Sequence, residues 1–194
     1  MRELILGGQR SGKSARAETL AAQWLARSPA HGAVFIATAQ AWDDEMRERI
    51  ARHQRDRAQR LPGMQTVEEP LALAEALAQH SRPQTLVVVD CLTLWLTHQL
   101  MPAAGVPDSG VLGANRAGVQ DGRPLSASFL IALQQSAGPV VLVSNEIGLG
   151  VIPMGREVRA FVDALGRLNQ QVAAVCDRVT LMAAGLPLTL KSPE

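Results

Sequence analysis

The sequence lacks several features that would place it in a specialised class of protein. It has only two cysteines, Cys91 and Cys176, which lie far apart without metal-ligand spacing. Each lies in an apolar stretch, so we expect two reduced core residues, and a disulfide-stapled fold is excluded. No apolar run approaches the ~20 residues of a membrane helix, and the N-terminal one is too short for a signal peptide. We expect a cytoplasmic protein without membrane insertion.

The chain also has little net charge. Its 19 basic and 18 acidic residues leave a formal charge of +1, which argues against a broad basic face for duplex nucleic acid. Of the 19 basic residues 17 are arginine, a side chain suited to bidentate binding of phosphate or carboxylate. The length of 194 residues and the 47% hydrophobic content are enough for a sizeable core. We expect one domain spanning residues 1–194, and the arginines leave anionic small molecules as candidate ligands.

Short apolar runs that alternate with helical patterns predict an α/β fold. Runs that are apolar on both faces indicate strands of a mostly parallel sheet covered by helices on both sides. The predicted strands are 4–6, 33–38, 85–90, 139–144 and 178–182, with 186–191 as a possible edge strand.

Four helices are predicted between these strands. The first begins at Lys13 or Ser14 and has one apolar stripe. Residues 43–60 carry 11 charged side chains in 18, acids first and arginines later, which suits the dipole of a mostly solvated helix. Residues 71–79 and 156–175 predict helices that cover the core. Residues 101–124, with five Gly and three Pro, predict a surface excursion.

The strongest motif is a glycine-rich loop between the first strand and the first helix. It fits the pattern G-x-x-x-x-G-K-[ST], whose backbone N–H groups surround a phosphate at a helix N-terminus. Its lysine, Lys13, reaches the outer phosphates, and the hydroxyl of Ser14 can hold Mg²⁺. The motif consists of Gly7, Gly8, Gln9, Arg10, Ser11, Gly12, Lys13 and Ser14.

An acidic residue, Asp90, lies at a position suited to a metal ion beside the phosphate loop. Asp90 closes the buried run 85–89, at the carboxyl end of a predicted core strand. An aspartate after a strand often only caps a turn. Beside a phosphate loop we interpret Asp90 as a second ligand of Mg²⁺, together with Ser14.

A histidine on the charged helix is a candidate nucleophile. His53 has Arg49 and Arg57 at i−4 and i+4, on the same helical face. Two guanidinium groups would disfavour protonation of the imidazole and would bind phosphates of a molecule that it attacks. Spacing alone leaves open that His53 is a solvated surface residue.

A second polar cluster follows the predicted strand 139–144. Ser144, Asn145 and Glu146 precede a glycine-rich segment, at the end of a sheet strand where ligands of α/β proteins bind. The same side chains could instead cap the next segment, and the sequence does not decide between these two interpretations.

Six segments together resemble one enzyme family, the bifunctional adenosylcobinamide kinase/adenosylcobinamide-phosphate guanylyltransferases of cobalamin biosynthesis. The likeness covers nearly the whole chain, and the segment with His53 and the segment 144–153 are specific in order and spacing. The segments are GGQRSGKS (7–14), IAT (36–38), WDDEMRERI (42–50) with His53 after it, VEEP (67–70), VDCLTLW (89–95) and SNEIGLGVIP (144–153).

The resemblance implies a RecA-like P-loop fold and two activities. The enzyme would phosphorylate adenosylcobinamide with ATP or GTP and then transfer GMP from GTP through a guanylyl-histidine at His53. The family typically forms a trimer. Besides the phosphate loop, the resemblance implies nucleotide binding by Thr38, Ala39, Gln40, Gln54, Arg55, Asp56, Arg57, Glu68 and Asp90.

Two other functions compete with this interpretation. One is a plain P-loop kinase of a small molecule, in which His53 is a surface histidine. The other is a nucleotide-binding switch or interaction module without turnover of a corrinoid. No residue in the sequence indicates the base that would accept the proton of the substrate hydroxyl.

Overall fold

A computed structural model of the chain describes residues 1–41, 44–101 and 123–193. Within the helices, the side chains of Met46, Arg49, His53 and residues 123–125 lie outside this description. Most of the predicted excursion, residues 102–122, also lies outside it. Helix α5 already begins at Arg123, inside the range expected to be irregular.

Seven strands of the described chain form one sheet in the order β3-β2-β4-β5-β1-β6-β7. All neighbouring strands are parallel except β7, which pairs antiparallel with β6 at the edge. The strands are β1 (Arg2–Gly7), β2 (Gly32–Ala37), β3 (Met64–Glu68), β4 (Thr85–Asp90), β5 (Val140–Val143), β6 (Arg178–Ala183) and β7 (Leu186–Lys191).

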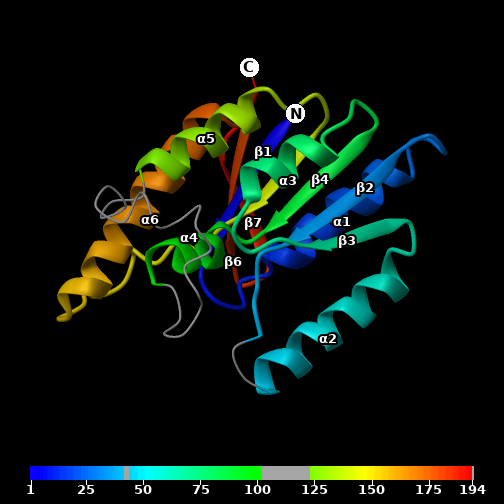
Figure 1. The fold of residues 1–194 in the computed structure, drawn as a ribbon. Helices are drawn as coiled ribbons and strands as arrows, with labels where there is room; N and C mark the ends of the chain where they lie inside the picture. The colour runs from blue at the N-terminus through cyan, green and yellow to red at the C-terminus, as the bar shows by residue number, and fades with distance from the viewer. Residues whose placement is uncertain (42–43, 102–122, 194) are drawn as a thin grey trace.

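Helices cover both faces of this sheet, as Figure 1 shows. Alternate strand residues face opposite cores: Leu86 and Val88 pack with α1, whereas Val87 and Val89 pack with α3 to α6. The helices are α1 (Lys13–Leu25), α2 (Asp44–Arg60), α3 (Leu73–His80), α4 (Leu92–Leu100), α5 (Arg123–Gln134) and α6 (Arg156–Val175). The predicted mostly parallel, doubly covered RecA-like fold is confirmed.

The element predictions hold except for three omissions. All five predicted core strands and the edge strand 186–191 are present, and the four predicted helices correspond to α1, α2, α3 and α6. Strand β3 and helices α4 and α5 were not expected. No described helix is both long and apolar enough to cross a membrane.

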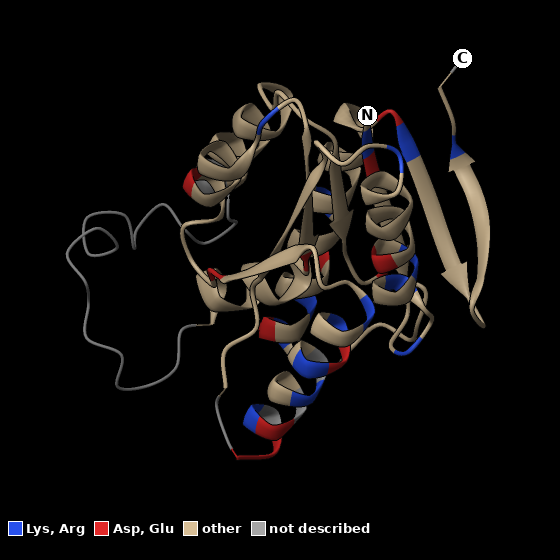
Figure 2. Ribbon diagram, turned by 90° about the vertical axis from the view of Figure 1, so that its right-hand side faces the viewer, with Lys and Arg blue, Asp and Glu red and all other residues tan. Residues whose placement is uncertain are grey.

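Helix α2 differs from the other helices in its exposure and charge. It extends away from the sheet in Figure 1, and the ribbon of Figure 2 shows many charged residues along it, in blue and red. Asp44, Glu45, Arg47 and Glu48 in its first turns are exposed. The prediction of a mostly solvated helix is confirmed.

Both cysteines are free and buried, as expected. Cys91 lies between β4 and α4, and Cys176 follows α6. Burial raises the pKa of each thiol to about 12. Both groups therefore stay protonated and act as small core residues.

Two glycines give a matched test of this packing. A Cβ on Gly138, before β5, would lie 2.0 Å from the backbone oxygen of Arg82, whereas one on Gly166, within α6, meets nothing within 4 Å. We expect Gly138→Ala to lower the free energy of unfolding by about 2 to 3 kcal/mol. Gly166→Ala should raise it by about 0.5 to 1 kcal/mol, because alanine favours helix. Urea unfolding measures both changes. If both variants had the same unfolding midpoint as the wild type, this packing would be contradicted.

Candidate active site at the phosphate loop

The glycine-rich loop connects β1 to α1 as the sequence predicts. Gly7 and Gly12 have φ angles of 152° and 99°, which L side chains rarely adopt. A Cβ on Gly7 would also lie 2.5 Å from the backbone oxygen of Met182. The loop therefore needs glycine at both positions to bring its backbone round to the start of α1.

Lys13 is held across the mouth of the loop. Its Nζ donates a hydrogen bond to the backbone oxygen of Gly8 at 2.6 Å, and the residue is buried. Burial lowers the pKa of Lys13, and the nearby Asp90 carboxylate opposes that shift. The ammonium group is thus placed where the phosphates of a nucleotide would replace the Gly8 oxygen as its partner.

Ser14 and Asp90 meet, although they are 76 residues apart. The Ser14 Oγ donates to the Asp90 Oδ2 at 2.6 Å, which joins the first turn of α1 to the end of β4. Hydroxyl and carboxylate oxygens are ligands that suit Mg²⁺. The described residues contain no group of three or more His, Cys, Asp or Glu side chains that could hold a metal. The Ser14 and Asp90 oxygens thus fit a magnesium ion bound beside the phosphates of a nucleotide.

Thr38 fixes the position of Asp90. Its Oγ1 donates to the backbone oxygen of Cys91 at 2.7 Å and accepts from the Cys91 N–H at 2.8 Å. Its own N–H donates to the Asp90 backbone oxygen at 3.1 Å. Thr38 is fully buried, so its hydroxyl joins the ends of β2 and β4 at the edge of the site.

The second half of α2 is anchored by Arg57. The guanidinium of this buried residue lies 3.4 Å from the centre of the Phe35 ring and donates to Thr66 Oγ1 at 3.2 Å. Its Nε lies 3.8 Å from a carboxylate oxygen of Glu18 on α1. Burial lowers the pKa of Arg57, and Glu18 opposes the shift. Here Arg57 holds α2 against α1 and β3, and contact between Arg57 and a nucleotide stays a prediction.

The other residues predicted outside the phosphate loop lie on this helix, in the loop after β2 and at the end of β3. Gln54 Nε2 donates to Glu68 Oε1 at 2.6 Å, so these two candidates are in contact. Arg55 and Asp56 are exposed on α2, and Ala39 and Gln40 are half-buried after β2. The backbone of His53 lies in α2 one residue before Gln54, and its side chain is outside the described part of the structure.

The polar cluster after β5 lies beside the phosphate loop. The N–H of Glu146 donates to the backbone oxygen of Gly7 at 3.1 Å, and that of Asn145 donates to Thr93 Oγ1 at 2.8 Å. The Nδ2 of Asn169, on α6, donates to the Asn145 backbone oxygen at 3.1 Å. The sequence left the role of this cluster open, and the structure places it at the site.

Sequence reasoning did not single out Thr93 or Asn169. Both are buried polar residues that hold the segment after β5 in place. Asn169 could have been found, because it falls on the buried face of a predicted helix, between Leu165, Leu168 and Val172. Thr93 could not, because α4 was not expected.

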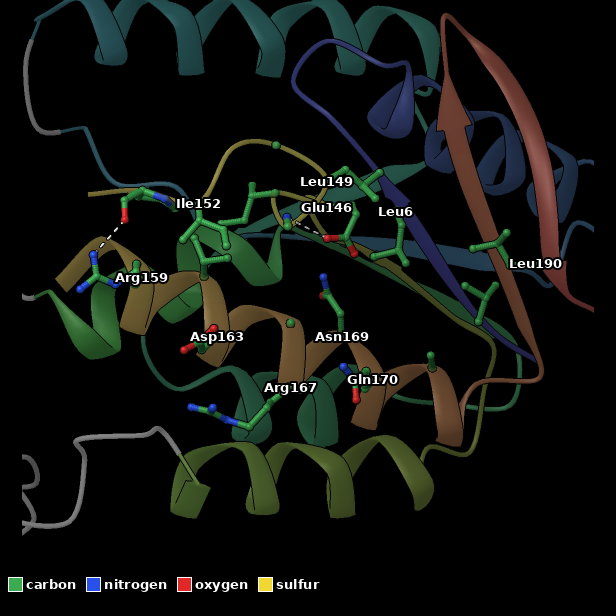
Figure 3. A pocket seen from close by; sticks show the side chains of 18 of the residues that line it. Leu6, Glu146, Leu149, Ile152, Arg159, Asp163, Arg167, Asn169, Gln170 and Leu190 are labelled. Carbon is green, nitrogen blue, oxygen red and sulfur yellow. Dashed lines mark hydrogen bonds between the residues drawn. The ribbon is translucent and has the colours of Figure 1, made fainter. Parts of the chain in front are cut away.

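A pocket of about 960 Å³ begins at this cluster. It lies between residues 146–153, helix α6 and the strands β6 and β7, and Figure 3 shows its lining side chains. Leu6, the neighbour of Gly7 in β1, forms part of the wall. The pocket therefore borders the phosphate loop on the side away from α2.

Comparison with known proteins gives a consistent answer over the whole chain. Residues 3–190 match the family described as cobinamide kinase / cobinamide phosphate guanyltransferase. The chain is 46% identical over 192 residues to the bifunctional adenosylcobalamin biosynthesis protein CobP of Pseudomonas aeruginosa, covering 98% of each chain. It is 34% identical over 194 residues to the bifunctional adenosylcobalamin biosynthesis protein CobU of Escherichia coli, covering 97% of this chain and 98% of the relative.

A solved structure supports the fold alone. The flagellar accessory protein FlaH from Methanocaldococcus jannaschii superposes with a TM-score of 0.51 at 11% identity, covering 99% of this chain and 78% of that one. At this identity the likeness concerns the arrangement of strands and helices and not the activity.

The Thr38 hydroxyl can be tested by its effect on stability. We expect Thr38→Val to lower the free energy of unfolding by about 2 kcal/mol, because the buried N–H and C=O of Cys91 both lose their partner. Thr38→Ser, which keeps the hydroxyl, should lose less. Chemical denaturation of the three proteins measures the difference. If the valine variant were as stable as the wild type, this hydroxyl would not be what joins β2 to β4.

Proposed function

This chain belongs to the cobinamide kinase / cobinamide phosphate guanyltransferase family, and from that premise we propose that it makes adenosylcobinamide-GDP in two steps. It phosphorylates adenosylcobinamide with ATP or GTP and then transfers GMP from GTP to the resulting phosphate. The family match establishes an enzyme with kinase and guanylyltransferase activities that acts in cobalamin biosynthesis. The observation that best supports this use of the site is the contact of Ser14 with Asp90 directly beside Lys13.

In the kinase step the phosphate loop holds the outer phosphates of the nucleotide. Backbone N–H groups of the loop and the N-terminus of α1 would face the phosphates, and the Lys13 ammonium would neutralise developing negative charge. Ser14 and Asp90 would hold Mg²⁺, which when bound draws charge from the phosphate oxygens. The substrate hydroxyl attacks the γ-phosphorus in line, the bond to the β-phosphate oxygen breaks, and the hydroxyl proton passes to a base that stays unassigned.

In the second step His53 is the proposed nucleophile. Its imidazole nitrogen attacks the α-phosphorus of GTP, a P–N bond forms, and pyrophosphate leaves. An oxygen of adenosylcobinamide phosphate then attacks the same phosphorus, the P–N bond breaks, and His53 is regenerated. The charged, exposed first half of α2 and its anchored second half support this role, because the helix begins free of the core and ends beside β3.

Residues around α2 are proposed to bind the guanine nucleotide. They are Thr38, Ala39 and Gln40 after β2, Gln54 to Arg57 on α2, Glu68 at the end of β3, and Asp90 at the end of β4. The contact between Gln54 and Glu68 and the link from Thr38 to Asp90 support a single group at the carboxyl edge of the sheet.

We further propose that residues 1–194 act as one domain and that the enzyme assembles as a cytoplasmic homotrimer. All six described residues of the edge strand β7 are exposed, among them Leu186 and Leu188. Exposed leucines on a sheet edge are a surface that subunit contacts would cover.

The covalent step predicts that only the α-phosphate of GTP stays on the protein. After incubation with Mg²⁺ and GTP labelled at the α- or the γ-phosphate, denatured wild-type enzyme should retain α-label that is labile to acid and stable to alkali. His53→Ala should retain none, while His80→Ala, a histidine at the end of α3, should label like the wild type. If the wild type binds GTP but keeps no α-label, the plain kinase or the nucleotide switch is the better interpretation.

The metal assignment predicts a changed requirement for Mg²⁺. We expect Asp90→Asn to raise the Mg²⁺ concentration for half-maximal kinase rate by about tenfold, since one carboxylate ligand loses its charge. Glu75→Gln removes one charge from an exposed position on α3 and should leave that concentration unchanged. Initial rates measured over a series of Mg²⁺ concentrations test this. Equal midpoints for Asp90→Asn and the wild type would rule out Asp90 as a ligand.

A further inference from the structure

The pocket beside the phosphate loop is larger than a phosphate site requires. Its volume of about 960 Å³ lies at the upper end of the range of about 300 to 1,000 Å³ for small-molecule sites. The lining residues include none of the phosphate loop and none of the residues proposed to bind the guanine nucleotide. A second and larger ligand would therefore have room here.

One end of this pocket lies next to the phosphate loop. Glu146 lines the pocket and donates its N–H to Gly7, and Leu6 in the pocket wall directly precedes the loop. A molecule seated in the pocket can therefore present one substituent to a nucleotide held at Lys13, while the rest of the molecule lies along α6.

The segment after Glu146 gives the pocket an apolar wall. Leu149, Val151 and Ile152 line it and are 80%, 96% and 77% exposed. These side chains contribute little to the core of their own chain. A group of adjacent apolar side chains that is this exposed to solvent usually marks a binding surface.

The same segment is held at both ends. The Oε1 of Glu146 accepts a hydrogen bond from the Gly148 N–H at 3.0 Å. At the other end Arg159 donates to the backbone oxygens of Pro153 and Met154, and Figure 3 shows this arginine at the rim of the pocket. The wall is thus positioned before any ligand arrives, which lowers the entropy cost of binding.

Polar side chains line the opposite wall. Asp163, Arg167 and Gln170 lie along α6 in Figure 3 and face the pocket together with the buried Asn169. They offer both donors and acceptors. A corrinoid matches both walls. Its broad ring has apolar methyl groups for the apolar wall, and the neutral carboxamide groups around the ring can form hydrogen bonds with the polar wall.

We propose that this pocket binds the corrinoid ring of the acceptor, with the apolar wall against the ring and α6 toward its carboxamides. This inference rests on the proposed function, since it assigns a place to the substrate of both steps. One substituent of the corrinoid receives first the phosphate and then GMP. In this placement it points from the pocket toward Lys13.

Charged substitutions in the apolar wall test the proposal. Leu149→Glu and Ile152→Glu should each raise the Kd for adenosylcobinamide at least about tenfold, because apolar contact is replaced by a charge that must lose water. Met154→Glu is the matched control, since Met154 is 94% exposed in the same segment but does not line the pocket. Equilibrium dialysis read by the visible absorbance of the corrinoid gives Kd, and GTP binding should be unchanged in all three variants.

A thiol placed in the wall gives a second measurement. Both native cysteines are buried, so maleimide should react selectively with Val151→Cys. Adenosylcobinamide should slow that reaction, and GTP should not.

The outcomes separate the two levels of the proposal. A wild type that neither binds nor turns over adenosylcobinamide contradicts the proposed function itself. Normal wild-type turnover with unaltered corrinoid Kd in both wall variants overturns only the placement in this pocket. Weaker corrinoid binding that accompanies dissociation of subunits in light scattering also overturns it, because the wall would then be a contact between copies of the chain.

Discussion

The site depends on a short set of hydrogen bonds at the carboxyl edge of the sheet. Parallel strands end together at one edge, but their ends are held in a fixed arrangement only if the backbone groups there find partners. Thr38 supplies them for Cys91, and Ser14 joins Asp90 to the first turn of α1. These contacts tie three segments distant in sequence into one frame. Strand pairing places the backbone of Asp90 between β2 and β5, and the Ser14 bond directs its carboxylate toward the first turn of α1.

Sequence patterns predicted the parts of the fold that have one clear burial pattern. Strands buried on both faces read as continuous apolar runs, and α6 has a single apolar stripe that ends where the helix ends. Helix α4 was missed because Leu92, Trp95, Leu96 and His98 are all buried, and a helix covered on several sides has no stripe. Strand β3 was missed because only Met64 is buried, while Thr66 and Glu68 contact side chains of α2.

In the candidate site, too, the sequence predicted local features but not contacts between distant segments. The phosphate loop follows from its motif, since glycine at φ > 0 and a lysine at the helix start are local requirements. The meeting of Ser14 with Asp90 depends on the order of strands, which a resemblance or a fold can supply but spacing cannot. Arg57 illustrates the remaining gap. Its charge suggested a phosphate ligand, and the fold adds contacts with Glu18, Thr66 and the Phe35 ring. The sequence could not predict these contacts, because all three partners lie in other elements.

The strand order gives a physical reason why one phosphate loop can serve two reactions. Helix α2 is attached through β2 and β3 at one end of the sheet, and the large pocket borders β1, β6 and β7 toward the other end. Asp90 lies between them on β4. In the proposed reactions, a nucleotide held at Lys13 is therefore approached by His53 from one flank and by the corrinoid acceptor from the other. An in-line displacement needs its nucleophile opposite the leaving group, so two nucleophiles on opposite flanks can act on different phosphates without displacing each other. The acceptor can then remain in one pocket while the nucleotide is exchanged between the two steps.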